Sequence, residues 1–214
     1  TNQNGLSIGV VGNWATFETD GHELEGGLLG NEKNSTSISE NVSFPGIFIE
    51  ATAGVPNGGV TLTMGAEYTP GSATIGSKSR TDVTTDGKEA IQDDGTYTAK
   101  ADVEKLLTLY IEPGFMVNEY FGMYAKAGAS KVTVNTLESI AVGASSAVYG
   151  DADIWGTMYG AGLKLATPWG IFMKVEGTIT QFEELTLTST TGNINSITAE
   201  PEQRTVKLAL GYNF

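Results

Sequence analysis

Two groups of ionisable residues in this sequence could carry chemistry. The first surrounds the only histidine, His22, which lies in a run with Asp20, Glu23 and Glu25. A histidine beside carboxylates can act as a general base or help to bind a divalent cation. The chain has no Cys and no second His, which excludes thiol chemistry and a metal site built from several histidines of one chain. We expect His22 to be a solvated residue, and we predict no catalytic residue, no enzyme activity, no metal site and no cofactor.

The second group consists of four glutamates and four lysines that share the polar face of apolar segments. They are Glu50, Glu67, Glu112, Lys126, Lys164, Lys174, Glu176 and Lys207. In residues 60–69, for example, Val60 and Leu62 lie on one face of a strand and Glu67 on the other, because side chains alternate along a strand. None of the eight charges interrupts an apolar face. Collected on one face of a sheet, they can pair with one another.

Alternation of this kind recurs in eight segments and predicts an all-β protein. The segments are 5–17, 42–55, 60–69, 103–113, 121–134, 155–167, 171–187 and 205–214. Val11 and Phe17 break the alternation of the first one. Three connections are short and contain Pro, Gly or Asn, which favour tight turns. The other four are long and polar, at about 18–40, 70–100, 135–153 and 183–202. Because the long connections come at every second position, they lie together at one end of an up-and-down meander, which we interpret as a single domain over 1–214.

The apolar face of such a sheet can point in two directions. In a soluble sandwich or lipocalin-like barrel it faces inward. In a transmembrane barrel it faces lipid, and the charged face lines the lumen. No run approaches the ~18–20 apolar residues of a membrane-spanning helix, but the apolar stripes are close to the ~9–11 residues that a tilted strand needs.

Aromatic residues favour the transmembrane alternative. They fall near both ends of the apolar stripes, as two interfacial girdles require. The predicted girdle residues are Trp14, Phe44, Tyr68, Trp155, Trp169, Tyr212 and Phe214. The sequence therefore predicts an eight-stranded antiparallel up-and-down transmembrane β-barrel, or a ten-stranded one if 70–100 contains a further hairpin.

The chain is acidic, with a net charge of -13 at pH 7. Most of the acidic residues lie in the four long connections, whereas acids and bases nearly balance in the strands. A protein of this charge does not neutralise phosphates, so we exclude nucleic acid as a partner.

Two segments resemble small outer-membrane barrels of Gram-negative bacteria. The ending Val206–Phe214 is an alternating strand closed by a terminal Phe, and it resembles the C-terminal assembly signal of these barrels at Tyr212 and Phe214. Residues 159–165, followed by a turn with Pro, resemble the sixth strand of the OmpA/OmpX/Opa-type eight-stranded family. The resemblance implies insertion by the barrel assembly machinery into the Gram-negative outer membrane, after removal of a signal peptide. It also implies contact with outer-membrane lipid and lipopolysaccharide, both termini in the periplasm and four loops outside the cell.

The interior of an eight-stranded barrel is just wide enough to be filled by side chains. We therefore interpret the eight charges as a salt-bridged plug of the lumen. The predicted function is that of an outer-membrane structural or surface-interaction protein whose acidic loops bind an extracellular partner. The alternative is a narrow channel or small-solute transporter that uses the charged lumen. A soluble ligand-binding barrel is the third hypothesis.

Overall fold

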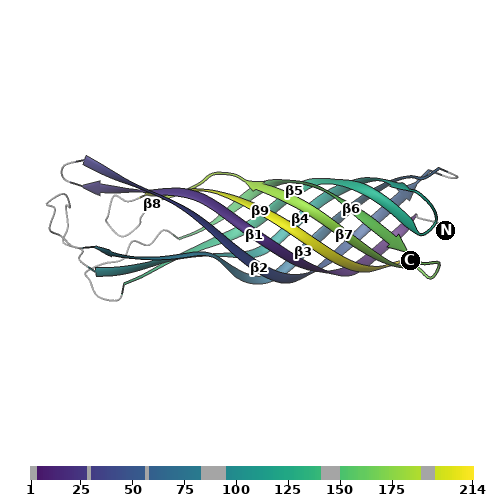
Figure 1. Ribbon diagram of the computed structural model, residues 1–214, viewed down its shortest axis with the longest axis horizontal. Coiled ribbons are helices and arrows are strands. Elements are labelled where there is room, and N and C mark those ends of the chain that lie inside the picture. The colour runs from purple at the N-terminus through teal and green to yellow at the C-terminus, as the bar shows by residue number, and fades with distance from the viewer. Residues whose placement is uncertain (1–3, 28–29, 56–57, 83–94, 141–149, 189–195) are drawn as a thin grey trace.

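The computed structural model describes residues 4–27, 30–55, 58–82, 95–140, 150–188 and 196–214. They form an elongated barrel of tilted strands (Figure 1). The strands are β1 (Gly5–Gly27), β2 (Gly30–Gly54), β3 (Val60–Asp82), β4 (Gly95–Met116), β5 (Phe121–Ile140), β6 (Asp151–Ala166), β7 (Ile171–Phe182), β8 (Leu185–Thr188) and β9 (Ser196–Asn213). No helix among these residues is long and apolar enough to cross a membrane.

The strands close into an antiparallel barrel with eight strand positions around its circumference. Each strand from β1 to β7 pairs with the next, β7 pairs with β9, and β9 pairs with β1 to close the ring. The short β8 also pairs with β9, beyond the end of β7, so β7 and β8 follow one another along the same neighbour. The prediction of eight strands is confirmed. The ten-stranded alternative is wrong, because Ser72–Asp82 and Gly95–Glu104 pair with each other as continuations of β3 and β4.

The barrel has one end with short turns and one end with long strands. At the short-turn end, tight connections such as Thr167–Gly170 join the strands, and Gly170 adopts a φ of 86° that favours glycine. Both termini lie at this end (Figure 1). At the opposite end, which we call the long-strand end, the hairpins extend well past the other strands.

The extension of the strands differs from the predicted loops. Within the predicted loop 18–40, β1 continues to Gly27 and β2 begins at Gly30. Within 70–100, strand pairing covers residues 72–82 and 95–100. The reason is that these segments are mostly polar, with isolated apolar residues such as Ile75, so the sequence has no apolar alternation there, although backbone pairing continues. Residues 83–94, 141–149 and 189–195, the centres of the other predicted loops, lie outside the described residues.

The wall of the barrel is irregular at one level of β4. The pairing of β3 with β4 shifts between Thr69 and Ser72, and the pairing of β4 with β5 shifts between Glu104 and Leu107. Lys105 lies between these shifts and has a φ of 56°, a conformation that side chains other than Gly, Asn and Asp rarely adopt. Bulges of this kind bend a strand and interrupt its ladder.

Candidate functional site in the barrel lumen

The eight charged residues of the polar face all lie on the inner side of the barrel wall. Seven are buried, and Lys164 is half-buried. The alternation of each strand places them there, since their neighbours along the chain, such as Met173 and Val175 beside Lys174, are exposed on the outside.

Ion pairs join the buried charges across the lumen. The ammonium group of Lys207 lies 2.8 Å from Glu67 and 3.7 Å from Glu176. The same oxygen of Glu176 lies 2.9 Å from the ammonium group of Lys126. Glu176 on β7 therefore links a lysine of β9 with a lysine of β5.

Glu112 continues this series of contacts from β4. One of its oxygens lies 3.2 Å from Lys126, and the other lies 2.7 Å from Lys174. Lys174 in turn contacts the carboxylate of Glu50 on β2. The result is an unbroken alternation of charge from Glu67 to Glu50, which we call the ion-pair chain; its members are Glu67, Lys207, Glu176, Lys126, Glu112, Lys174 and Glu50. Buried charges require such compensation, because the cost of an unpaired ion in a low-dielectric interior is several kcal/mol.

Two tyrosine hydroxyls donate hydrogen bonds to carboxylates of the ion-pair chain. The Tyr110 hydroxyl donates to Glu50 at 2.8 Å, and the Tyr124 hydroxyl donates to Glu176 at 2.8 Å. The ring of Tyr110 also lies 3.8 Å below the Lys126 ammonium group, a cation–π distance. Glycines make room for both rings: a Cβ added at Gly65 would clash with Tyr110, and one at Gly162 would clash with Tyr124. Neither tyrosine was among the predicted site residues, although each shares the strand face of a predicted charge.

Lys164 lies apart from the ion-pair chain. Among the described residues, no carboxylate is within ion-pair distance of it; its ammonium group lies 4.3 Å from the centre of the Phe172 ring. Phe172 packs against Phe48, with 6.1 Å between ring centres, in a small apolar cluster with Val11 and Ala209. The prediction placed Lys164 in the same network as the other charges, and the structure does not bring it into contact with them.

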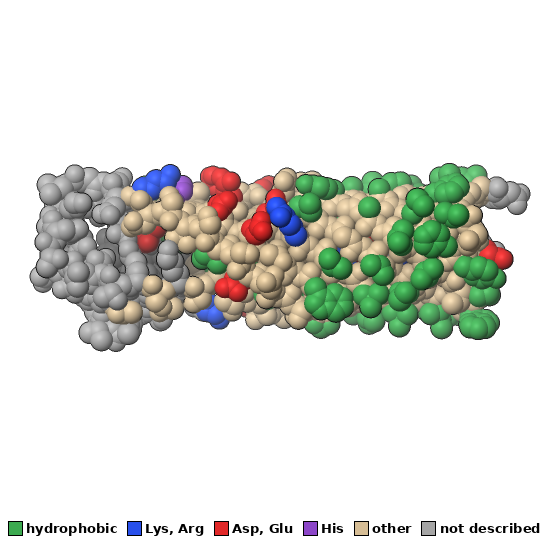
Figure 2. Space-filling model, viewed as in Figure 1, with side chains coloured by type: hydrophobic (Ala, Val, Ile, Leu, Met, Phe, Trp, Pro, Cys, Tyr) green, Lys and Arg blue, Asp and Glu red, His purple; other side chains and the backbone are tan. Residues whose placement is uncertain are grey.

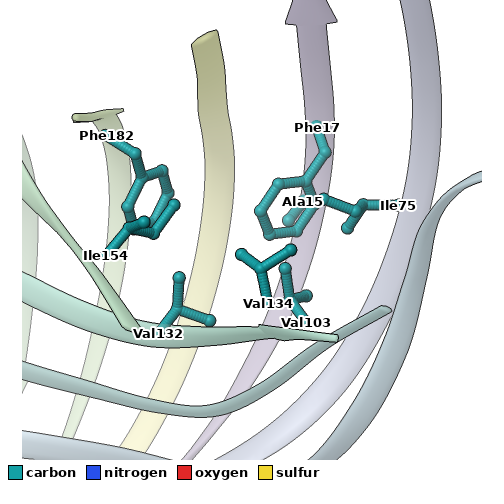
Figure 3. Packing of buried hydrophobic residues seen from close by; sticks show 8 residues of the cluster. All are labelled: Ala15, Phe17, Ile75, Val103, Val132, Val134, Ile154 and Phe182. Atoms are coloured by element: carbon teal, nitrogen blue, oxygen red, sulfur yellow. The ribbon is translucent and has the colours of Figure 1, made fainter. Parts of the chain in front are cut away.

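A second apolar cluster fills the lumen toward the long-strand end (Figure 3). We call it the upper apolar cluster; it consists of Ala15, Phe17, Ile75, Val103, Val132, Val134, Ile154 and Phe182. The sequence offered one sign of it, since Phe17 breaks the alternation of the first segment. The lumen is therefore occupied at two levels, by the ion-pair chain and by the upper apolar cluster.

The polarity of the wall inverts between these two levels. On β5, Met123 faces outward and Lys126 inward, whereas farther along Lys131 faces outward and Val132 inward. On the face that Figure 2 shows, hydrophobic side chains gather over the short-turn half, and most of the charged ones lie beyond it toward the long-strand end.

The outer band decides between the soluble and the transmembrane alternatives. Val60 and Leu208 are 54% and 43% exposed, while Glu67 and Lys207 are 4% and 6% exposed. An apolar outer band around a polar, charged interior is the arrangement of a barrel that faces lipid, and a closed barrel leaves no unpaired edge in the hydrocarbon. The chain forms a transmembrane β-barrel. Its strand number is that of the small eight-stranded members of this class.

The chain is similar to several solved structures at low sequence identity. No family model matches the chain, and no curated protein sequence matches it. Solved structures similar to it include Ail, the attachment invasion locus protein of Yersinia pestis, with 12% identity over 93% of this chain and 98% of that one and a TM-score of 0.38. Neisserial surface protein A has 9% identity over 94% and 97% of the two chains, with a TM-score of 0.34. The outer membrane protease OmpT of Escherichia coli has 10% identity over 100% and 98%, with a TM-score of 0.46.

The predicted girdle residues fall on the outside of the barrel, with one exception. Trp14, Tyr68 and Trp155 are exposed toward the long-strand edge of the apolar band, and Trp169, Tyr212 and Phe214 are exposed at the short-turn end. The prediction for Phe44 is wrong. Phe44 is half-buried and packs against the upper apolar cluster, because it shares the inner face of β2 with Phe48 and Glu50.

The predicted assembly signal lies at the end of β9. Tyr212 and Phe214 are exposed, and their rings meet edge to face with 5.0 Å between centres. The backbone N–H of Phe214 donates to the carbonyl of Leu6 at 2.9 Å, so the last residue is tied to β1 where the barrel closes. Their role in assembly stays a prediction.

The histidine run lies in β1 and not in a loop. His22 pairs with Ser35 of β2 and Thr198 of β9, and it is half-buried. Asp20 accepts a hydrogen bond from the Ser37 hydroxyl. Among the residues that the structure describes, no three His, Asp or Glu side chains are grouped so that they could hold a metal ion.

Proposed function

We propose that this protein is a non-conducting outer-membrane surface protein, in which a plugged barrel carries extended, acidic hairpins that bind a partner outside the cell. In this proposal the short-turn end faces the periplasm. The observation that supports it is that side chains occupy the lumen at two levels, first the ion-pair chain and then the upper apolar cluster.

The ion-pair chain supports a static plug. Its contacts draw on β2, β3, β4, β5, β7 and β9, so it ties together strands from opposite sides of the lumen. Ions moving through this level would have to separate buried pairs, and those moving farther would meet Phe17, Val132 and Phe182, which offer no polar ligands. A channel based on the charged lumen is the alternative, and it has to open both levels.

The long strands support the interaction role. From Trp14, at the edge of the apolar band, to Gly27 there are thirteen residues of β1, which is roughly 40 Å of strand at about 3.3 Å per residue. This length carries the loops well away from the lipid. The acidity of the long connections favours a partner with a basic surface, since complementary charge speeds encounter and discriminates among partners.

The absence of catalysis is also part of the proposal. The single histidine of the chain, His22, lies on the polar extension of β1, away from the buried carboxylates of the lumen. A surface-binding role requires no reaction at His22 or at the lumenal carboxylates.

Conductance across planar bilayers tests the closed lumen. We expect the purified protein to give no stable current steps. A variant with Glu112→Ser and Phe17→Ser removes one side chain from each level, and it is expected to conduct while keeping the electrophoretic shift between unheated and heated samples that marks a folded barrel. Glu112 is suitable because Lys126 and Lys174 each keep another carboxylate partner. Stable, ion-selective steps from the unchanged protein would establish the channel alternative.

Shortening of the first hairpin tests the interaction role. Thr19 and Ile38 are partners in the β1–β2 ladder, so residues 20–37 can be replaced by Asn-Gly, a two-residue hairpin turn. Binding to surfaces coated with polylysine, and with polyglutamate as a control, is then compared with that of the full chain, at low and at high salt. The proposal expects salt-sensitive binding that the shortened variant loses. Equal binding by both proteins would mean that the first hairpin takes no part in the interaction.

A further inference from the structure

The wall irregularity around Lys105 leaves a small gap in the barrel. Opposite Pro70 and Gly71 of β3, β4 supplies Lys105, which has no partner in the ladder with β3 or in the ladder with β5. Pro70 has no N–H to donate, and Gly71 has a φ of 101°. The strands are therefore held together less firmly here than above or below, where the ladders resume at Ser72 and Thr69.

The gap runs from the outer surface of the wall to the apolar interior. Its cavity measures about 30 Å³. Pro70, Gly71 and Lys105 line it on the exposed side. Phe17, Val103 and Val132, which line it on the inner side, all belong to the upper apolar cluster.

The position of the gap relative to the membrane limits what can reach it. Tyr68 and Leu107, the exposed apolar residues of β3 and β4 nearest the long-strand end, lie within two residues of Pro70 and Lys105. The gap is therefore at the boundary between the lipid tails and the polar layer. The ligands available there are amphiphiles, with a chain in the lipid and a head group in water.

Lys105 supplies a charge at the mouth of the gap. Its side chain is exposed, and no carboxylate of the described residues is within ion-pair distance of it; Asp153, which pairs with Lys131, interacts with Lys105 only at longer range. By contrast, Lys131 on the neighbouring strand is 2.7 Å from Asp153. A lysine that is held in an unfavourable backbone conformation and has no ion-pair partner in the described structure can accept an anionic head group.

We propose that this gap is a lateral binding site for a single-chain anionic amphiphile of the fatty-acid class. The carboxylate lies against Lys105, and the chain enters between β3 and β4 to contact Phe17, Val103 and Val132. The cavity has room for one or two carbon atoms, comparable to the volume of about one water molecule, so a longer stretch enters as the bulged segments move apart. The missing ladder bonds of Pro70 and Lys105 permit that movement. The ion-pair chain closes the lumen on the side toward the short turns, so the site holds the chain and does not pass it on.

Photolabelling tests this site in phosphatidylcholine nanodiscs. The probe is palmitic acid with a diazirine in the middle of its chain, and labelled positions are found by mass spectrometry. We expect labels on Val103 and Val132, which face the lumen. Labels confined to lipid-facing residues such as Leu107 and Leu109 would overturn the proposal. The proposal would also be overturned if a phosphatidylcholine with the same diazirine chain labelled the lumenal residues and the free acid did not, because the site would then hold a lipid with two chains.

Two variants separate the roles of charge and space. Lys105→Asn keeps a residue that tolerates positive φ and removes the charge. It is expected to reduce lumenal labelling by the acid roughly three- to fivefold, the size of one exposed ion pair, and to leave labelling by the corresponding fatty alcohol unchanged. Ala73 also lines the cavity, and Ala73→Val is expected to abolish lumenal labelling by both probes.

The matched controls lie on the neighbouring strand. Lys131→Gln removes an outward lysine that does not line the gap, and Ala129→Val adds the same atoms on the lipid-facing side of β5. Both are expected to label as the unchanged protein does. Lumenal labelling that persists in Ala73→Val, or that falls equally in Lys105→Asn and Lys131→Gln, would refute the site. The conductance of all variants stays that of the unchanged protein, so this test is independent of the plugged lumen.

Discussion

Replacement of Lys207 by Met is expected to destabilise the barrel far more than loss of an equally close ion pair on its outer surface. Lys207 lies 2.8 Å from Glu67, and the side chains are 7% and 5% exposed. Glu176 keeps Lys126 as a partner, but Glu67 has no other ion pair in the described structure. Removing one partner of a buried pair costs about 3–5 kcal/mol, because the remaining charge is buried without compensation. We expect a loss of this size in the free energy of unfolding.

The control is Lys131→Met. Lys131 lies 2.7 Å from Asp153, with side chains 39% and 50% exposed, and pairs of this kind contribute about 0.2–1 kcal/mol. Distance alone would make the two variants equal, so the comparison isolates burial. Unfolding by urea in phospholipid vesicles, followed by tryptophan fluorescence, measures both.

The double variant Lys207→Met with Glu67→Gln completes the experiment. It removes the isolated carboxylate, so it is expected to be more stable than Lys207→Met alone by about 2 kcal/mol, which is roughly half of the cost of an uncompensated charge. A Lys207→Met variant as stable as Lys131→Met would refute the reasoning, and so would a double variant less stable than the single one. Either result would mean that water reaches the lumen and screens these charges.

Three further predictions concern single residues. Glu112→Gln is expected to cost only about 1 kcal/mol in the same urea assay, because Lys126 and Lys174 keep Glu176 and Glu50 as partners; a loss equal to that of Lys207→Met would contradict it. Leu109→Arg puts a charge on the lipid-facing band and is expected to cost about 2–4 kcal/mol, whereas Ser77→Arg on the polar extension of β3 should change stability by less than about 0.5 kcal/mol. Hydrogen bonds from Lys131 and Thr133 lower the pKa of the exposed Asp153 carboxyl below its usual 3.8; its stabilising contribution is therefore complete above about pH 4 and lost as pH falls through the lower folded-state pKa. Asp153→Asn should therefore abolish the part of the fall in the urea midpoint at acid pH that comes from protonation of Asp153. A variant whose midpoint depends on pH as that of the unchanged protein does would argue against the ion pair of Asp153 with Lys131.

The sequence was sufficient for the part of the fold that crosses the membrane. There the two faces of each strand meet different surroundings, so alternation is regular, with Val11 as an exception, and marks both the strands and the side of the wall on which each residue lies. Glu67 and Lys207 could be placed inside, and Val60 and Leu208 outside, from parity alone. The same parity would have placed Phe44 inside and added Tyr110 and Tyr124 to the lumenal residues, but chemical type was given more weight than position.

The sequence was not sufficient where local pattern carries no information on pairing. Glu112 and Lys174 are 62 residues apart, and their contact depends on how the strands are staggered around the barrel, which no single strand encodes. The same stagger leaves Lys164 away from the ion-pair chain. Extension of β1 to Gly27 was missed because both faces are polar. The bulge at Lys105 was missed because it depends on the partner strand, where Pro70 and Gly71 add residues that β4 does not match.

The inversion of polarity along each strand also fixes the height of the barrel in the membrane. Movement of the barrel outward by two residues would bring lipid-facing residues such as Trp155 into water. Movement inward would bring Lys131 and Asp153 toward the hydrocarbon, where the cost of a lysine rises from about 0–1 kcal/mol near the interface to about 2–4 kcal/mol at the midplane, and that of an aspartate is smaller. The ion-pair chain lies at the level of the apolar band and the upper apolar cluster lies beyond it, so each of these two groups lies behind an outer surface of the opposite polarity. A polar filling at the upper level would leave that part of the wall with no apolar contact on either face. The upper apolar cluster thus supplies the hydrophobic core for the extension, since neither lipid nor the paired charges can stabilise it there.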